Sequence, residues 1–298
     1  MSVDLPAASA FMAGHARALD RRRYELLNGA LDTAGMLAAL DGYRNADGGY
    51  GWGLEPDLRS PESQPAAAHH AFEVFEEIAP ATNTHAVALC DWLESISLED
   101  GGLPFALPLS LAAGSGPWWQ GPDPDRSSLQ ITSITAAAAH RVATHDPAVA
   151  AHPWLERATT YCMREIAALD STPFAYVLAF SIQLLDTVYD TRPEAPELLH
   201  KLGEHVPSSG HVAVTGGTEG ETLTPLHLAP YPDRPARALI NPDVIAADLE
   251  RLAAGQRDDG GWTVDYLQIS PAGVLDWRGY STVRAIKILR SNGSISPD

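Results

Sequence analysis

An Asp-Gly-Gly sequence recurs three times in this 298-residue chain, and its spacing constrains the fold more than any other feature. The copies lie at 47–49, 100–102 and 259–261, and an apolar or aromatic residue follows each one. The first two copies are 53 residues apart, and the third follows the second after 159 residues, three times that interval. Self-similarity at a fixed period indicates a repeat architecture, and a unit of about 50 residues suits two helices and a Gly-rich loop. About six such helical hairpins fill the chain.

Helical periodicity supports this interpretation. Ala68, Phe72 and Phe75 lie at i, i+4 and i+7, the spacing of one helix face, in a segment that opens at about residue 64. The same spacing recurs at 245–252, after an Asn-Pro pair that can cap and begin a helix. Further helices are expected over 7–23, 33–44, 84–96, 127–145, 153–169, 173–188 and 193–205, and after Ser281. The best strand pattern, at 211–214, is short, so the sequence predicts an all-α fold of about ten to twelve helices.

The third copy has the most specific sequence. Gln256 to Trp262, preceded by Leu-Ala-Ala-Gly, resembles the QW repeat of squalene–hopene and oxidosqualene cyclases. A Gly-Gly-aromatic repeat of similar shape occurs in the β subunits of protein prenyltransferases, and 47–52 and 100–105 look like degenerate copies. The resemblance to this terpene cyclase and prenyltransferase-like family implies one α/α toroid, an (α/α)6 barrel with a central cavity, over residues 1–298. It also implies that Gln256 and Trp262 brace successive helices and do no chemistry.

The catalytic motifs of those families are absent. The nearest approach to the D-x-D-D acid motif is 123–126, where Arg126 replaces a carboxylate. The D-D-x-x-D metal motif fails at 258–262, which lacks the last acid. A zinc prenyltransferase needs a cysteine in the C-terminal third, and no cysteine follows Cys162. We therefore expect neither a metal nor another cofactor.

The densest group of polar residues lies at 51–65. Pro56 and Pro61 push the residues before them into extended conformations, so the segment should cross one end of the barrel. It reaches Gln64 at the expected start of a helix, where free backbone N–H groups and the helix dipole favour anions.

Asp57 is the first candidate for a catalytic acid. It should reach the mouth of the cavity, where Glu55 competes with it for Arg59. Two carboxylates crowded around one cation leave one of them protonated near neutral pH. The sequence therefore predicts a raised pKa for Asp57 or Glu55 and a general-acid role for one of them.

Asp276 is the second candidate acid, in a segment expected to be a loop directly before the last helix. An acid and an arginine lie one or two residues apart in four such segments: Asp57 and Arg59, Asp125 and Arg126, Asp233 and Arg234, and Asp276 and Arg278. Each pair either staples its loop or presents its acid to the cavity mouth. Aromatic residues accompany the loops and could pack an apolar substrate. The candidate substrate-binding residues are Trp52, Arg59, Gln64, Trp118, Trp119, Trp277, Arg278 and Tyr280.

The eleven histidines show no tight metal-ligand spacing. His69 and His70 point two ways on one helix, so at most one of them faces the cavity. We expect both to be core or surface histidines.

The charge balance excludes several classes of partner. Twenty basic against 38 acidic residues give a net charge of −18 and a pI of about 4.9, which disfavours nucleic acid and anionic lipid. The longest uncharged stretch, 101–122, is broken by prolines and cannot span a membrane. No secretory signal and no disulfide framework are evident, so a cytoplasmic protein is expected.

Three functions are compatible with these observations. The first is a small terpene-cyclase-like enzyme, an isomerase or lyase, that cyclises or isomerises an isoprenoid or other apolar molecule by protonation in the central cavity. Asp57 or Asp276 would be the acid, Glu55 would modulate it, and Arg59 or Arg278 would orient it. The second is a carbohydrate-active (α/α)6 barrel enzyme, and the third is a non-catalytic binder of an apolar ligand or peptide. The substrate and the oligomeric state stay open.

Overall fold

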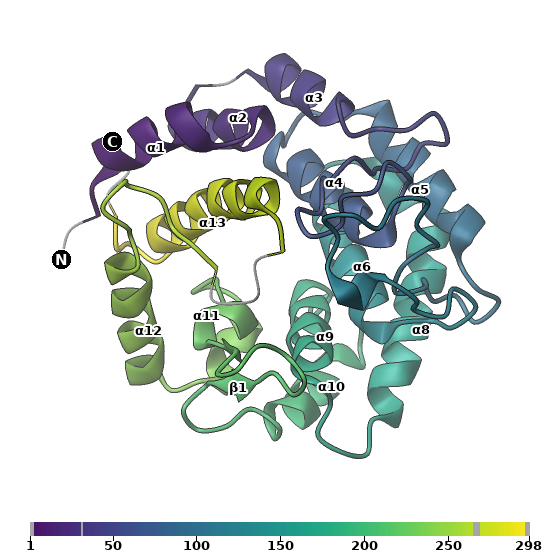
Figure 1. Cartoon of the computed structure of the whole chain (residues 1–298). Helices are drawn as coiled ribbons and strands as arrows, with labels where there is room; N and C mark the ends of the chain where they lie inside the picture. Colours follow the sequence, from purple (N-terminus) through teal and green to yellow (C-terminus); the bar gives the residue numbers. More distant parts are fainter. Residues whose placement is uncertain (1–2, 31, 265–268, 296–298) are drawn as a thin grey trace. The chain divides into compact units, whose positions relative to one another are not determined.

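The computed structural model describes residues 3–30, 32–264 and 269–295. Within them the chain is mostly helical, with thirteen α-helices, two short 3₁₀-helices and one pair of β-strands (Figure 1). The helical class expected from the sequence is confirmed. None of the described helices combines the length and the apolar composition that crossing a bilayer requires.

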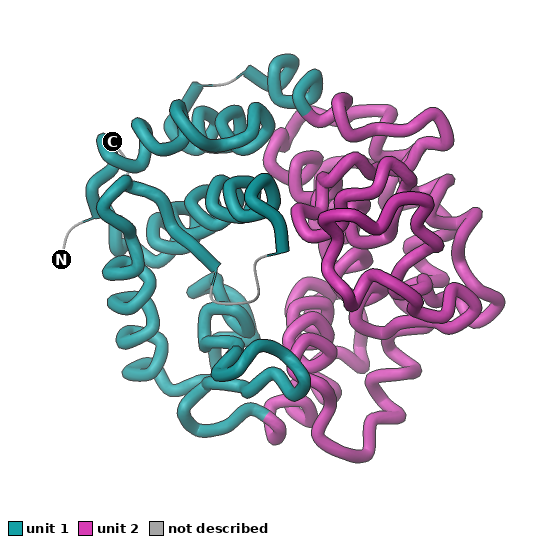
Figure 2. The backbone as a smooth tube through the Cα atoms, in the orientation of Figure 1, with its two compact units in different colours: residues 1–39, 206–298 teal, residues 40–205 magenta. Residues whose placement is uncertain are grey.

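The chain divides into two compact units (Figure 2). Unit 1 is formed by residues 1–39 and 206–298, and unit 2 by residues 40–205. Helix α3 (Thr33–Asp41) begins in the first and ends in the second.

Unit 1 joins the two ends of the chain. Its core contains Phe11, Met12, Trp262 and Ile286, contributed by segments far apart in sequence. The antiparallel strands pair Val212 with Leu223, which confirms the short strand expected at 211–214. The elements of this unit are α1 (Leu5–His15), α2 (Ala18–Leu27), β1 (Val212–Ala213), β2 (Thr222–Leu223), α11 (Pro225–Leu228), η2 (Pro235–Leu239), α12 (Pro242–Ala254) and α13 (Pro271–Ser291).

Unit 2 contains two rows of helices. Helix α6 (Leu129–Ala143) packs between α4 (Pro65–Glu77) and α9 (Ala175–Thr187), and a second row is formed by α5 (Thr84–Ile96), α8 (Pro153–Ala168) and α10 (Ala195–Gly203). The four alanines at 136–139 of α6 are fully buried. Their small side chains let the neighbouring helices approach α6 closely. The remaining elements are η1 (Pro117–Trp119) and α7 (Pro147–Ala150).

The start of α13 differs from the sequence prediction. The helix begins at Pro271, ten residues before Ser281, because the Ser270 hydroxyl accepts the Gly273 N–H at 3.0 Å and Pro271 takes the first helical position. Asp276 and its aromatic neighbours therefore lie within a helix and not in a loop. Gly279 interrupts the apolar pattern for a packing reason, since it faces Ala16 near the start of α2.

The three Asp-Gly-Gly turns share one structure. In each turn the aspartate accepts the N–H of the second glycine, at 2.9, 3.0 and 3.2 Å in chain order. The backbone N–H two residues before the aspartate donates to the carbonyl of that glycine, at 2.9 Å in every copy. The first glycine has a φ of 93°, 91° and 93° in Gly48, Gly101 and Gly260. A positive φ of this size is accessible to glycine at little cost, so the turn needs glycine at this position.

Each turn also packs on a helix in the same way. A Cβ added to the first glycine would collide with the backbone carbonyl of Ala88 in α5, Arg157 in α8 or Ala7 in α1. The second glycine faces an aromatic ring four residues further along the same helix, namely Trp92, Tyr161 or Phe11. The sequence period is therefore a structural repeat, with two copies in unit 2 and one in unit 1.

Gln256 and Trp262 brace the third turn. The Gln256 side chain accepts the Asp4 N–H at 2.8 Å and donates to the carbonyls of Asp4 and Gly260, which joins the turn to the start of α1. The Trp262 indole donates to the Leu252 carbonyl at 2.7 Å, and the Trp262 backbone N–H donates to Thr282 at 3.0 Å. These hydrogen bonds agree with the bracing role that the resemblance implies for both residues.

Replacing Trp262 with alanine is expected to lower the free energy of unfolding by about 3–5 kcal/mol, because the indole is almost fully buried between α12 and α13. Urea denaturation measures the change. Trp52→Ala is the matched control: its ring is 57% exposed, and we expect a loss of about 1 kcal/mol or less. Equal denaturation midpoints for Trp262→Ala and the wild-type chain would contradict the bracing role.

Candidate functional site

The loop at 51–64 precedes α4 and is pinned at both ends. The Trp52 N–H donates to the Ser60 carbonyl, and the Gln64 N–H donates to the Tyr50 carbonyl, each at 2.8 Å. Trp52 itself has a φ of 56°, and its exposed indole donates to Asn45 at 2.8 Å. The loop is closed on itself, which allows its interior residues to be buried.

Glu55 and Asp57 lie in the buried part of this loop. Their exposed fractions are 8% and 4%. Glu55 Oε2 lies 3.0 Å from His70 Nε2, and Glu55 Oε1 accepts the Asp57 N–H at 3.3 Å. His70 Nδ1 lies 3.1 Å from Glu73 Oε2. We refer to Glu55, His70 and Glu73 as the carboxylate–histidine triad.

The triad holds a protonated histidine. Burial lowers the pKa of His70, but hydrogen bonds and charge interactions with Glu55 and Glu73 outweigh it and raise the pKa to about 9. At neutral pH the imidazolium therefore donates from both nitrogens to the two carboxylates. Glu73 is less deeply buried than His70, so the triad runs from a partly exposed carboxylate to a buried one.

The partner of Glu55 differs from the sequence prediction. We expected Glu55 to compete with Asp57 for Arg59, and the structure pairs it with His70 instead. The reason is that α4 begins at Pro65, so His70 falls in its second turn, against the loop. Sequence reasoning missed His70 and Glu73 as site residues. Their i, i+3 spacing on a helix whose start was correctly predicted is the signal that could have found them.

One group of residues on α4 could in principle hold a metal ion. His69, His70 and Glu73 offer donor atoms that lie within 4.8 Å of one another. However, both His70 nitrogens already contact carboxylates, the arrangement of a protonated imidazolium, which has no lone pair to give. The described contacts are ion pairs between His70 and two carboxylates.

Gln64 is bound to the backbone of a second loop. Its side-chain amide donates to the Leu107 carbonyl at 3.2 Å and accepts the Leu107 N–H at 2.9 Å. The side chain is fully buried, so the structure gives Gln64 a structural contact where we had expected substrate binding.

Two further hydrogen bonds join the same two loops. The Gly116 N–H donates to the Asp57 carbonyl, and the Arg59 N–H donates to the Ser115 hydroxyl, each at 2.8 Å. Trp119 lies in the same loop, shortly after Gly116, and is buried. Its ring stacks on Phe105 at a centroid distance of 4.8 Å. Its neighbour Trp118 is exposed.

The other candidate residues lie in unit 1, on α13. Arg278 binds Asp259 of the third turn through two hydrogen bonds of 2.6 and 2.8 Å and lies over the Phe11 ring. Because of these hydrogen bonds the pKa of Asp259 is lowered. Arg278 thus staples a turn, with Asp259 as the acid rather than the expected Asp276. Asp276 is partly buried, while Trp277 and Tyr280 form an edge-to-face pair.

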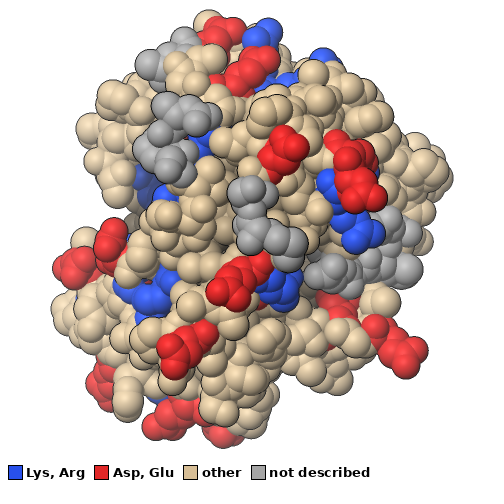
Figure 3. Space-filling model, turned by 90° about the vertical axis from the view of Figure 1, so that its left-hand side faces the viewer, with Lys and Arg blue, Asp and Glu red and all other residues tan. Residues whose placement is uncertain are grey.

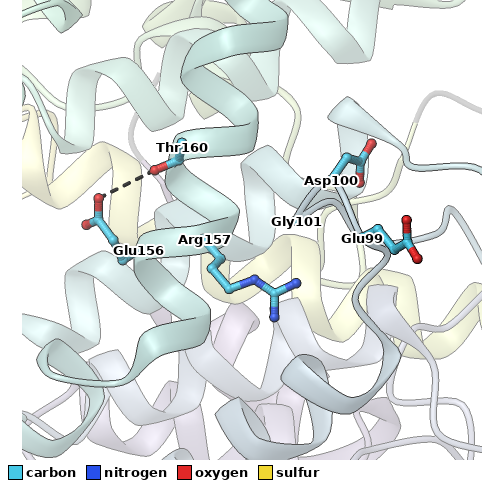
Figure 4. Close-up of a pocket in the computed structure, with 6 residues that line it drawn as sticks. All are labelled: Glu99, Asp100, Gly101, Glu156, Arg157 and Thr160. Atoms are coloured by element: carbon cyan, nitrogen blue, oxygen red, sulfur yellow. Dashed lines mark hydrogen bonds between the residues drawn. The ribbon is translucent and has the colours of Figure 1, made fainter.

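A cavity of about 240 Å³ lies beside the second Asp-Gly-Gly turn (Figure 4). It is lined by 99–101 and by Glu156, Arg157 and Thr160 of α8. Two of its charged groups have partners outside the lining: Arg157 binds Glu94, and Glu156 binds Arg192. These contacts tie helices together, and we assign no chemistry to this cavity.

The free energy of unfolding should fall between pH 6.5 and about 9. The pKa of His70 is raised in the folded chain, so protonation stabilises the fold below pH 6.5, and this contribution is lost as the pH rises through about 9. We expect a loss of roughly 3 kcal/mol relative to His70→Gln, which keeps polar contacts but not the charge. Urea titrations of both chains at pH 6 and pH 10 measure it. Parallel pH profiles would show that His70 is not the group responsible.

The triad thus holds a proton inside unit 2, between two carboxylates. Sequence comparison offers no further guide: no family model matches this chain, and no curated protein matches it.

Proposed function

We propose that this protein is a terpene-cyclase-like acid–base enzyme, an isomerase or lyase that acts on an isoprenoid or another uncharged apolar molecule. The reaction begins with proton transfer from Glu55, and Asp57 is the second carboxylate of the site. The observation that carries the proposal is the 3.0 Å contact between buried Glu55 and buried His70.

The identity of the partner matters to this chemistry. An arginine beside Glu55 could not give up a proton, because its guanidinium stays charged. His70 can: its Nε2 proton passes to Glu55 Oε2, and Nδ1 keeps its hydrogen bond to Glu73. Glu73 connects the histidine to the partly exposed side of α4, so the proton can be replaced after the reaction.

The proton then moves from Glu55 to the substrate. As the Glu55 O–H bond breaks, a C–H bond forms at an alkene carbon and leaves a carbocation. The carbocation loses a different proton to a carboxylate, either Asp57 or Glu55, and an isomerised or cyclised alkene results. The negative charge left on the carboxylates stabilises the cation while it exists.

Charge and architecture support the same proposal. On the face shown in Figure 3, Lys and Arg side chains are interspersed with Asp and Glu and do not gather into one basic surface. With the net charge of −18, this favours an uncharged substrate over a polyanion. The α/α toroid and a single domain over 1–298 are part of the proposal. The two helix rows of unit 2 and the turn structure common to both units support them.

A second function is favoured by the same contacts. The imidazolium of the triad pairs with a carboxylate of the loop and with one of α4, as it would if the triad only fastened the loop to the helix. The chain would then be a non-catalytic binder of an apolar ligand.

Deuterium transfer from D2O separates the two functions. We expect the wild-type chain to incorporate solvent deuterium into at least one member of a panel of uncharged isoprenoid alkenes, detected by mass spectrometry. Glu55→Gln and Asp57→Asn should lower the rate by about 100-fold or more. Glu62→Gln is the matched control on the same loop, where Glu62 binds Ser60 and Ser110, and it should keep the wild-type rate.

Thermal denaturation of the same variants completes the test. Catalytic roles require that Glu55→Gln and Asp57→Asn stay folded at the assay temperature. No deuterium transfer by the wild-type chain, or full transfer by a folded Glu55→Gln variant, would overturn the proposal. A large loss of stability without any wild-type transfer would identify the triad as a staple.

A further inference from the structure

Three side chains of α4 bring their donor atoms together. His69, His70 and Glu73 each offer one such atom, and these atoms all lie within 4.8 Å of one another. The helix places them there, because residues three and four apart are neighbours on its surface, and Glu73 follows His70 by three positions and His69 by four. The segment therefore presents two imidazoles and a carboxylate to one point, although no metal was expected from the sequence.

The distances between these donors suit a tetrahedral metal ion. His69 Nε2 lies 3.6 Å from Glu73 Oε1, and His70 Nδ1 lies 3.1 Å from Glu73 Oε2. Zinc binds histidine nitrogen and carboxylate oxygen at about 2.0–2.2 Å, so two of its tetrahedral ligands are about 3.3–3.6 Å apart. Rotation of side chains on an already formed helix can bring the three donors to one ion.

Glu55 supplies the partner that a metal-bound histidine needs on its other nitrogen. Its Oε2 lies 3.0 Å from His70 Nε2. A ligating histidine commonly donates its second N–H to a carboxylate, which fixes the ring and makes the bound nitrogen more basic. The loop contact therefore holds the buried His70 ring with Nδ1 directed at Glu73, the orientation that a ligand requires.

The charges of the triad also favour a dication. One imidazolium faces two carboxylates, so the three groups together carry one net negative charge. A divalent ion that replaces the proton on His70 Nδ1 brings two positive charges against two negative ones, and the displaced proton passes to the solvent. The side chains of His69 and Glu73 are 15% and 16% exposed, so an ion can reach these donors from outside.

We propose that His69, His70 and Glu73 form a binding site for Zn²⁺ or a similar first-row divalent ion, and that Glu55 positions His70 in it. Three protein ligands leave the fourth tetrahedral position to water. Two imidazoles and one carboxylate select zinc over Mg²⁺ and Ca²⁺, which prefer sets of oxygen ligands. The site does not rest on the proposed function, although the two share His70.

Calorimetric titration with zinc chloride tests the binding. We expect the full wild-type chain, prepared without a histidine tag, to bind one ion with a Kd of about 10 μM or below. Magnesium chloride should bind at least about 100-fold more weakly. Cobalt(II) should bind at the same place and give the visible absorption of a four-coordinate ion, which reports the ligand geometry directly.

Variants of single residues locate the site. His69→Ala removes one ligand, keeps the triad and suits a helix, and it should weaken zinc binding at least tenfold and abolish the cobalt absorption. Glu55→Gln should weaken zinc binding about tenfold, because a neutral amide does not make His70 Nδ1 more basic. His85→Ala is the matched control, since His85 is also a helical, partly exposed histidine and its Nδ1 lies 3.1 Å from the carboxylate of Asp41. It should keep the wild-type affinity.

The outcomes separate this inference from the proposed function. The absence of micromolar zinc binding by the wild-type chain, or equal binding by a folded His69→Ala variant, would overturn the metal site, whatever the deuterium assay shows. Circular dichroism verifies that each variant is folded. If all chains bind zinc as expected and none transfers deuterium, the metal site stands and the catalytic proposal fails.

Discussion

The close approach of a glycine backbone to a neighbouring helix is the constraint on which the rest of the structure depends. In all three Asp-Gly-Gly turns a side chain on the first glycine would meet a helix carbonyl, and the second glycine leaves room for an aromatic ring of the same helix. Each turn therefore fixes how the chain passes from one helix to the next. In unit 2 the first turn leads directly into the loop of Glu55 and Asp57, so the packing of a glycine determines where two buried carboxylates lie.

Burying Glu55 needs compensation, and His70 provides it. An isolated carboxylate in a protein interior is strongly disfavoured, whereas one bound to an imidazolium is tolerated. The Gly116 N–H donates to the backbone of the same loop and the Ser115 hydroxyl accepts from it, so charge pairing and backbone pairing together keep an irregular segment inside the unit. The ion pair between Glu55 and His70 stabilises this loop, and the same ion pair places the imidazolium proton next to Glu55.

Local features were predicted well from the sequence and tertiary ones were not. The starts of α4 and α12 were predicted because Gln64-Pro65 and Asn241-Pro242 are short-range signals. The start of α13 was missed because glycines at 273 and 279 break the apolar period, and the second is explained only by contact with α2. The pairing of Glu55 with His70 was not predicted, because it depends on how a loop folds back on a helix, which no sequence spacing records.

The order in which the chain is synthesised gives the discontinuous unit 1 a particular consequence. Unit 2 is continuous from 40 to 205 and can become compact as soon as it leaves the ribosome. Unit 1 cannot, since Phe11 and Met12 of α1 are covered by Trp262 and Ile286 from the far end of the chain. During translation the apolar face of α1 therefore stays uncovered until more than 200 further residues have been made. At about 5–20 residues per second this interval is on the order of ten seconds or longer, long enough for a chaperone to bind the waiting helix.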